Sequence, residues 1–598
     1  MKKYLLFIMS GMLMTSCLDT IVLPKDIIID EDYWQNREQA QAMVNGAYKQ
    51  MVTDAVVKRM IVWGDYRSDE MNYETVQDLS GNSVWADLQK ISLGNIDSDN
   101  QFSVWSDVYS VINKCNIVLE KAPGVVSIDP AYTMETFNTD KSQMLALRSL
   151  CYFYLVRAYR DVPFTTVAYL NSSQDRNVAQ SAPADVLDRC ISDLEEALKS
   201  PISSSGYNDW RRVGIITEDG IKAILADIHL WKASVMHSED DYRKCIQYCD
   251  DIIASKKAAS LAGDGGFGPG ASTTSEYPLI GTTFARRELF VIGNSSESIF
   301  ELQMTGTNDV STAIKDMYFV IDKKNFGAVM ATKIFGTIGS ESGDNATVYT
   351  TNMDNRYLEN CYGVGDADAS AFDIRKMVDA NPNEFAPSDT KRDPYKLSAH
   401  NASAVNRPTL DRYGQNWIVY RLADIMLMKA EALVQLAADG ALTADDDNLT
   451  EAFNLVDAVN RRSLAKLDDA NVLKISSYTD KESMEQLVLC ERQRELCFEG
   501  KRWFDLMRYN YRHITPVDYT KTMFDISGDT YNEDLFPSNY SGFTNLVRRK
   551  YLENGVAIMA KMGREPFLYF PVPNSDMKVN PLLHQNPAYS EGDKYVKN

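Results

Sequence analysis

Apolar residues recur every three or four positions over much of this chain, which is the period that gives a helix one apolar face. Residues 102–123 follow this period with valine, isoleucine and leucine, and we expect their helix to stop at Pro123. Residues 141–164 predict a second long helix that ends before Pro163, because the position before a proline disfavours helical backbone. Residues 183–201 predict a third helix. The pattern therefore favours a protein built mainly from helices.

Two later stretches each predict a pair of helices joined by a short polar turn: residues 220–255 and 420–462. In both stretches alanines alternate with large apolar residues along the first helix. Small residues at this spacing let two helices approach closely. The pairs resemble tetratricopeptide helix hairpins, although no contiguous array of such repeats appears in the sequence.

Between residues 258 and 415 the helical period fades, and Gly, Ser, Thr and Asn become frequent. A similar polar segment covers residues 65–101. Long irregular regions inside a compact protein are usually functional or mobile. We therefore expect a mainly α protein with long loop-rich excursions, forming a single unit over residues 17–598. Its parts are an N-terminal helical part (17–257), the excursion, and a C-terminal helical part (416–598).

The stretch "ERQRELCFEGKRWFDLMRY", residues 491–509, mixes many charged side chains with large aromatic ones. Thr479 and Glu482 predict a capping box at the start of its helix. We interpret the stretch as scaffold, with charges paired at helix junctions and rings packed inward. The alternative is a ligand or partner site. Opposite charges lie at helical spacing in four places: Glu491 with Arg494, Arg492 with Glu495, Arg502 with Asp505, and Asp505 with Arg508.

The N-terminus has the pattern of an export signal. Lys2 and Lys3 precede an apolar run from Tyr4 to Met14, which is too short to span a membrane. Small residues and then Cys17 follow, which resembles a bacterial lipobox. We expect residues 1–16 to be a lipoprotein signal peptide and Cys17 to carry the lipid; the alternative is an ordinary signal peptide with an incidental cysteine. The sequence has no other stretch near the about 20 apolar residues that a spanning helix needs.

Charge and cysteine content exclude some classes of function. The 598 residues include 62 Lys and Arg against 83 Asp and Glu, giving a formal charge of −21, which argues against nucleic acid as the main partner. Eight cysteines follow Cys17, and we expect them to be free thiols packed as small hydrophobic residues. Cys245 and Cys249 lie one helical turn apart and could ligate a metal, but no further ligand motif accompanies them.

Catalytic signatures are missing from the sequence: it has no HExxH, no GxSxG and no P-loop motif. Residues 263–268 match GxGxxG without the strand–turn–helix context of a nucleotide site. Residues 366–373 resemble a calcium loop but lack its glycine and its closing glutamate. The adjacent carboxyls of Asp69 and Glu70 could serve a glycosidase. We predict no catalytic residue, no metal site and no cofactor.

Five motifs in order resemble the SusD/RagB family of nutrient-binding outer-membrane lipoproteins. The stretch 491–509 looks like the hallmark of this family. The others are "WSDVYSVINKCNIVLE", "ALRSLCYFYLVRAYRDVPF", "YRLADIMLMKAEAL" and, near the C-terminus, "YFPVPNSDMKVNPLLHQNPAY". In the motif that begins at residue 420, Tyr420 precedes Arg421 and Leu422 takes an aromatic place, which departs from the family pattern. Together with the lipobox, the motifs cover nearly the whole expected mature chain.

The resemblance implies a fold of about four tetratricopeptide-like helix pairs, with loops forming the ligand surface. It implies a lipid-anchored protein of the outer membrane that faces the cell surface and is not an enzyme. Its partner would be a SusC-like TonB-dependent β-barrel transporter, over which it would sit as a lid. Ligands of the family are usually glycans and sometimes peptides. The implied function is therefore capture of an oligosaccharide and its delivery to the barrel.

The resemblance places ligand contacts in a polar segment such as residues 63–89. Aromatic rings hold the C–H faces of sugars, and polar side chains hold their hydroxyls. The best single candidate is Trp85, although a stripe with Val84 and Leu88 would make it a packing residue instead. We expect Arg421 and Trp503 to belong to the core. The candidate ligand residues are Asp69, Asn72, Tyr73 and Trp85, with Tyr277, Tyr349 and Tyr357 as further possibilities.

Three other functions remain open on the sequence alone. A peptide ligand in the same transport role is the nearest alternative. A surface glycoside hydrolase and a purely structural surface lipoprotein are the alternatives from other classes.

Overall fold

The computed structural model describes most of the chain from Tyr33 to Tyr589. The described residues are 33–73, 81–171, 173–262, 276–281, 285–304, 311–318, 327–340, 346–361, 364–365, 371–372, 374–377, 415–514, 516–526, 547, 550 and 555–589. Cys17 and the signal peptide, the GxGxxG stretch and most of the calcium-loop resemblance lie outside these ranges. Among the described residues, no helix combines the length and apolarity required to span a bilayer.

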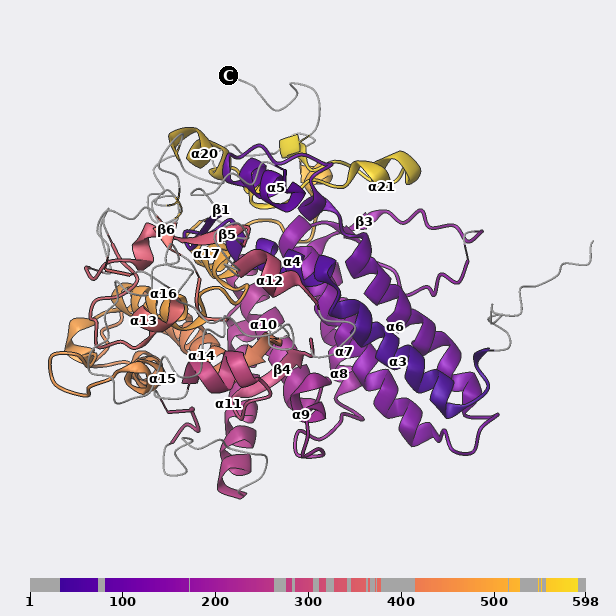
Figure 1. Ribbon diagram of the computed structural model, residues 1–598, viewed down its shortest axis with the longest axis horizontal. Coiled ribbons are helices and arrows are strands. Elements are labelled where there is room, and N and C mark those ends of the chain that lie inside the picture. The colour runs from indigo at the N-terminus through magenta and orange to yellow at the C-terminus, as the bar shows by residue number, and fades with distance from the viewer. Residues whose placement is uncertain are drawn as a thin grey trace, which may run out of the picture.

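Antiparallel helix pairs form the scaffold (Figure 1). Each helix contacts the next along the chain, from α3 through α6, α7, α8, α10 and α11 to α14 and α15. This confirms the expected mainly α scaffold of tetratricopeptide-like hairpins. The bounds are α3 (Arg37–Met51), α6 (Ser106–Val125), α7 (Met134–Tyr159), α8 (Pro183–Ala197), α10 (Glu218–Met236), α11 (Glu239–Ala262), α14 (Leu422–Leu436), α15 (Asp447–Ser463), α16 (Lys481–Leu496) and α17 (Arg502–Arg512).

Two of the predicted helix ends differ from the structure. Helix α6 continues through Pro123 to Val125, because a proline forgoes one backbone hydrogen bond but its fixed φ is helical. The capping box of α16 consists of Asp480 and Ser483, and the side-chain oxygen of each accepts from the backbone N–H of the other. The prediction from Thr479 was therefore wrong by one residue.

Short helices connect the long ones or cover the top of the molecule in Figure 1. They are α4 (Asp54–Ile61), the π-helix η1 (Val62–Tyr66), α5 (Ser83–Ser92), η2 (Gln101–Ser103), α9 (Arg211–Gly214), the π-helix η3 (Arg287–Ile292), α12 (Ala313–Tyr318), η4 (Lys333–Phe335), α13 (Arg356–Asn360), η8 (Ile475–Ser477), α18 (Met523–Ile526), α20 (Gly555–Met562), η10 (Glu565–Leu568), α21 (Asn574–Val579) and η11 (Pro587–Tyr589).

Small antiparallel sheets attach the excursions to the scaffold. Strand β4 (Ser298–Leu302), inside the long excursion, pairs with β7 (Trp417–Arg421), which directly follows the excursion. Strand β1 (Met71–Tyr73) pairs with β5 (Val329–Thr332), which also pairs with β6 (Ala371–Phe372). The polar segment at 65–101 therefore lies against the long excursion. A third sheet joins β2 (Val162–Pro163) to β3 (Gln180–Ser181).

The stretch 491–509 is scaffold, as the sequence predicted. Trp503 is buried and so is the Arg421 guanidinium, which donates to Glu495 and Glu499 at 2.6–2.9 Å. The charged side chains of residues 491–509 are buried, and each pairs with an oppositely charged side chain. Charges removed from water need such partners, so the network fixes how the helices meet.

The expected charge pairs hold in two of four places. Glu491 pairs with Arg494 at 2.8 Å, and Asp505 pairs with Arg508 at 2.7 Å. The other two predictions were wrong, because buried charges take partners from neighbouring helices. The Arg492 guanidinium binds Asp424 and Asp505, Glu495 binds Arg356, Arg421 and Arg462, and Arg502 binds Asp69.

Candidate ligand-binding surface

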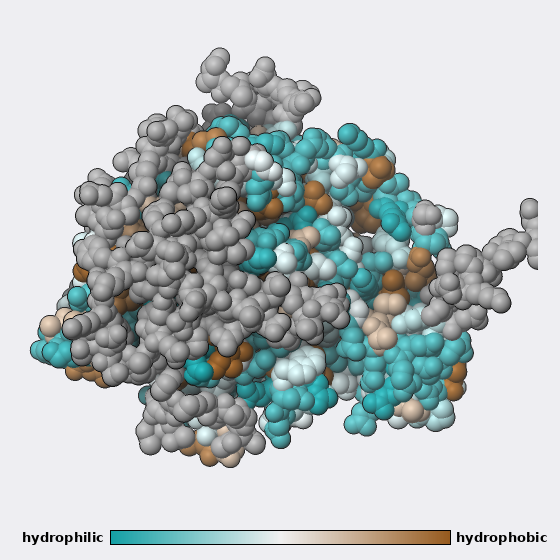
Figure 2. Space-filling model, in the orientation of Figure 1, coloured by the Kyte–Doolittle hydropathy of each residue, from teal (hydrophilic) through white to brown (hydrophobic). Residues whose placement is uncertain are grey.

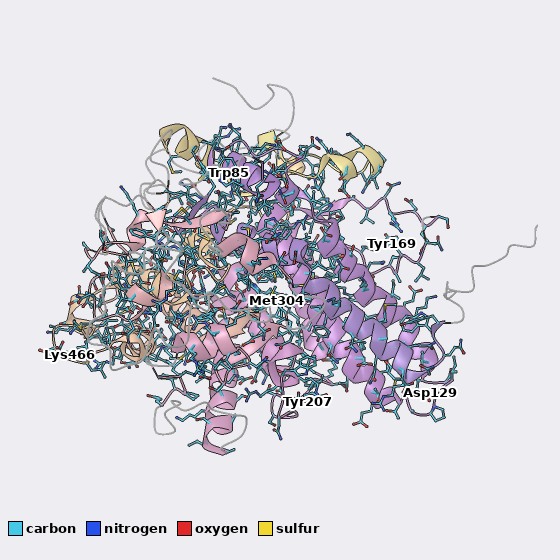
Figure 3. The ribbon with its side chains drawn as sticks, in the orientation of Figure 1. Trp85, Asp129, Tyr169, Tyr207, Met304 and Lys466 are labelled. Atoms are coloured by element: carbon cyan, nitrogen blue, oxygen red, sulfur yellow. The ribbon has the colours of Figure 1, made fainter. Side chains whose placement is uncertain are left out.

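Of the candidate ligand residues predicted from the sequence, Asn72 and Tyr73 lie on strand β1, and Trp85, labelled in Figure 3, lies on helix α5. Asn82 begins α5: its side-chain oxygen accepts from the backbone N–H groups of Val84 at 2.9 Å and Trp85 at 3.2 Å. This cap fixes Trp85 in the first turn of the helix. The backbone position of Trp85 is therefore set by local structure.

Trp85 lies beside Tyr73 rather than in the apolar stripe of its helix. The two rings meet edge to face, 5.6 Å apart at 83°, and both side chains are half-buried. Leu88 and Ile91 of α5 are buried, and Val84 packs against the core. Trp85 thus lies beside Tyr73, while Leu88 and Ile91 form the buried side of the helix. An aromatic pair with part of its surface exposed has the form of a sugar platform.

Asn72 lies between this pair and the scaffold. Its side-chain oxygen accepts from the Ser92 hydroxyl at 3.0 Å and from the backbone N–H of Tyr73 at 2.9 Å. The Ser92 hydroxyl also bonds the phenol of Tyr66 at 2.8 Å. Asn72 is half-buried, and its amide oxygen joins strand β1 to Ser92 at the end of α5.

Asp69 occupies a different environment from the other candidates. It is fully buried, and its carboxylate accepts two bonds from the Arg502 guanidinium, at 3.0 and 3.2 Å. Glu70 is also fully buried, and it accepts from the backbone N–H of Phe498 at 3.2 Å. Burial raises the pKa of Glu70 well above its ordinary value. Asp69 is therefore a scaffold residue in this structure, and the two carboxyls do not face solvent as a catalytic pair requires.

The three tyrosines of the long excursion also serve the framework. Tyr349 is fully buried and accepts from the Asn360 amide at 2.6 Å. Tyr357 is buried and donates to the carbonyl of Gly336 at 3.0 Å. Tyr277 is half-buried against the apolar cluster of α14 and α15. Tyr73 and Trp85 are thus the two half-buried candidates whose rings contact each other.

The eight cysteines after Cys17 are free thiols. Seven are buried and Cys490 is half-buried. Burial raises the pKa of Cys245 well above its ordinary value, which opposes the thiolate form that metals bind. The described part of the chain holds no cluster of three side chains able to ligate a metal.

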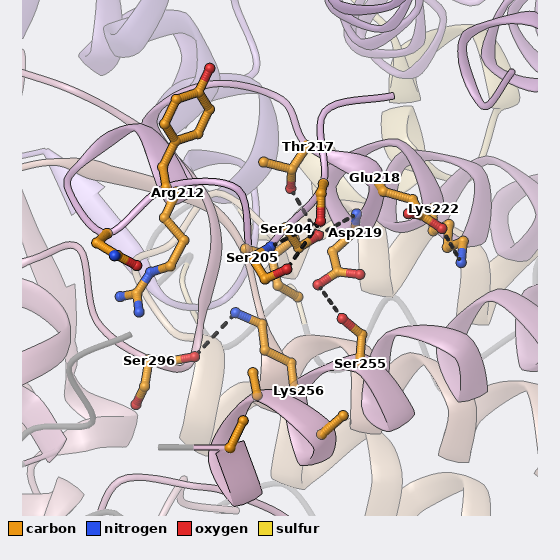
Figure 4. Close-up of a pocket in the computed structure, with 17 residues that line it drawn as sticks. Ser204, Ser205, Arg212, Thr217, Glu218, Asp219, Lys222, Ser255, Lys256 and Ser296 are labelled. Atoms are coloured by element: carbon orange, nitrogen blue, oxygen red, sulfur yellow. Dashed lines mark hydrogen bonds and ion pairs between the residues drawn. The ribbon is translucent and has the colours of Figure 1, made fainter. Parts of the chain in front are cut away.

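A cavity that the sequence did not predict lies between the loop 203–208, α10 and α11 (Figure 4). Its volume is about 330 Å³, and serines, Asp219 and Lys256 line it. The run "SSSGYND" was visible in the sequence, but its serines belong to the same site as Lys256 only through the packing of α10 on α11. The described surface in Figure 2 is otherwise mainly hydrophilic, with hydrophobic side chains in small separate spots.

Family models match both helical parts of the chain. One described as "SusD family" matches residues 296–589, and one described as "Starch-binding associating with outer membrane" matches residues 31–210. The chain belongs to the SusD/RagB family. The hallmark motif at 491–509 lies within the first match, and the Tyr73–Trp85 pair lies within the second.

Known SusD-like proteins match this SusD/RagB chain over nearly its whole length. A SusD-like protein of Formosa agariphila is 26% identical over 92% of this chain and 98% of its own length. A SusD-like protein of Bacteroides ovatus is 21% identical, and the match covers 98% of both chains.

Solved structures agree in fold. A SusD superfamily protein of Bacteroides vulgatus superposes with a TM-score of 0.62 at 16% identity, covering 93% of this chain and 100% of that one. The protein NanU of B. fragilis superposes with a TM-score of 0.58 at 16% identity, covering 95% of this chain and 100% of that one. At such identities the likeness shows the SusD/RagB fold alone.

Proposed function

We propose that this protein is a cell-surface lipoprotein that captures an oligosaccharide and delivers it to a TonB-dependent outer-membrane transporter. The observation that carries the ligand part is the half-exposed Tyr73–Trp85 pair on a rigid helical support. The family description "Starch-binding associating with outer membrane", whose match includes this pair, supports both the glycan and the membrane.

The ligand surface we propose consists of Tyr73 and Trp85, with Asn72 behind them. Two rings set edge to face offer one exposed aromatic face and one edge, against which apolar C–H groups of a sugar ring can pack. The cap at Asn82 and the strand pairing of β1 hold both rings before the ligand arrives. Preorganisation of this kind reduces the entropy lost on binding.

Calorimetry with a broad panel of glycans tests the ligand. The protein is prepared without residues 1–17, which leaves the described fold intact because this begins at Tyr33. We expect at least one oligosaccharide to bind, and Trp85→Ala to weaken it at least about tenfold, a loss of about 1.4 kcal/mol. Tyr169→Ala is the matched control, since this tyrosine is also half-buried but lies apart from Trp85 (Figure 3).

Failure of every glycan to bind contradicts the carbohydrate part of the proposal. Binding of peptides by the same surface, with the same loss in Trp85→Ala, would replace the oligosaccharide by a peptide in the same role. We propose no catalytic activity. Sustained release of reducing ends from a polysaccharide by the purified protein contradicts that statement.

The anchor and the partner are tested separately. Cys17 carries the lipid in our proposal, so Cys17→Ala should move the protein from the outer-membrane fraction to the soluble periplasmic fraction. Affinity purification of the tagged wild-type protein from detergent-solubilised membranes should recover a β-barrel transporter. If no barrel is recovered, a structural surface lipoprotein becomes the better description.

A further inference from the structure

The cavity between the loop 203–208, α10 and α11 has the size of a small-molecule site. Its volume of about 330 Å³ lies at the lower end of the range for such sites, about 300–1,000 Å³. Arg212 of α9 closes one side, and its guanidinium donates to the carbonyl of Asn294 at 3.0 Å. Short loops and two long helices therefore form its walls, and the long helices are parts of the scaffold.

Polar groups converge on this cavity from separate elements (Figure 4). Asp219 at the start of α10 is buried and accepts from the Ser255 hydroxyl at 2.9 Å. The Ser204 hydroxyl accepts from the backbone N–H of Asp219 at 3.1 Å and bonds Thr217 at 3.3 Å. These hydrogen bonds hold Asp219, Ser204 and Ser255 in place before any ligand binds, so the site is preorganised.

Lys256 of α11 provides the second charge. Its ammonium donates to the carbonyls of Ser296 and Ser298, at 3.1 and 2.5 Å. Burial lowers the pKa of Lys256 to about 8, whereas burial raises the pKa of Asp219. Burial therefore destabilises the charged forms of both Lys256 and Asp219. The Ser296 hydroxyl, also on the cavity wall, is buried and has no hydrogen-bond partner among the described residues.

We propose that this cavity binds a small neutral polyhydroxylated molecule of monosaccharide size. A hydroxyl group both donates and accepts, so neighbouring hydroxyls of one ligand can donate to Asp219 and accept from Lys256. The same ligand can supply the missing partner of Ser296. An anionic ligand would face the carboxylate of Asp219, and a cationic one would face Lys256 and Arg212. A neutral ligand avoids both repulsions.

The site is separate from the Tyr73–Trp85 surface. Figure 3 places Trp85 near α5 and Tyr207, on the cavity wall, at the opposite end of the view near α9. No side chain is shared by the two sites. The cavity therefore goes beyond the proposed function, and its binding can succeed or fail independently of glycan capture.

Saturation-transfer NMR tests the proposal with named probes. The chain from residue 18 onward is mixed at millimolar concentration with D-glucose, D-galactose, D-mannose and D-xylose, and in separate samples with D-glucuronate and D-glucosamine. We expect at least one neutral sugar to give a signal, and Lys256→Met and Asp219→Asn to lose most of it. Ala259→Trp fills the cavity without removing a charge and should lose the signal as well.

Two controls separate this site from general effects. Lys257→Met alters the neighbouring exposed lysine of α11, and Trp85→Ala alters the other surface; both should keep the signal. Absence of any neutral-sugar signal in the wild type overturns the proposal. So does a signal from the charged sugars alone, a signal that survives Ala259→Trp, or one that disappears in Trp85→Ala. Circular dichroism verifies that each variant is folded.

Discussion

At the scale of single residues, buried charge pairs have the largest consequences for stability. Asp69 is fully buried and depends on the Arg502 guanidinium, which lies on a helix more than four hundred residues further along the chain. We predict that Arg502→Met destabilises the protein by about 3–5 kcal/mol, because it leaves the carboxylate buried without a partner. Urea unfolding followed by circular dichroism measures the loss.

An exposed pair provides the control for Arg502→Met. Arg211 pairs with Asp209 at 2.7 Å, but both side chains are nearly half exposed. Arg211→Met should leave the unfolding midpoint unchanged, since water solvates the remaining carboxylate. If the two substitutions lowered the free energy of unfolding equally, burial of Asp69 would not determine how much its ion pair contributes to stability.

Residue-scale prediction from the sequence succeeded where partners are local. Pairs such as Glu491 with Arg494 follow from helical spacing alone. The partners of Arg492 and Arg502 come from other elements, and the spacing of residues contains no information about them. For the same reason, Asp69 looked like a surface carboxylate in a polar segment. Trp85 could be placed beside Tyr73 only from the structure, which locates both rings.

At the scale of elements, the apolar period and stop signals predicted most of the long helices, but they did not lead to a prediction of α3. The strands could not be predicted. Strand β1 is three residues long and pairs with β5 across more than 250 residues of chain, and β4 pairs with β7 across more than 100. Such short strands carry no alternation long enough to recognise. The cavity was missed for a related reason, since its walls meet only through packing.

Two glycines give opposite predictions for the same substitution. Gly64 lies in η1, where an added methyl group would meet the carbonyl oxygen of Gly500 well inside van der Waals distance. Gly64→Ala should therefore destabilise the protein by at least about 1–3 kcal/mol. Gly46 in α3 has open space around it, so Gly46→Ala should stabilise by about 0.5–1 kcal/mol through helix propensity. Thermal unfolding measures whether each substitution raises or lowers stability. A destabilising Gly46→Ala would contradict the open space around this residue in α3.

At the scale of the whole molecule, the N-terminal and C-terminal helical parts are joined through buried polar contacts. Asp65 accepts from the backbone N–H groups of Gly500, Lys501 and Arg502 at 2.6–2.9 Å. The Arg160 guanidinium pairs with Glu565 at 3.0 Å. Helix α17 also packs on both η1 and α10. The two parts thus complete one another's hydrogen bonds as well as one another's core.

A fragment experiment tests whether they form one unit. We predict that residues 33–262 alone do not fold, because Asp65 and Asp69 would remain in an apolar interior without their partners, and Arg160 would lose Glu565. Size-exclusion chromatography should show aggregation, and near-ultraviolet circular dichroism should show no fixed aromatic environment. The chain from residue 18 onward, as the control, should elute as a folded species and unfold in a single transition. A monomeric fragment with a native-like spectrum and cooperative unfolding would mean instead that the N-terminal helices are an independent domain, and that the contacts at Arg502 and Glu565 only dock a second domain onto it.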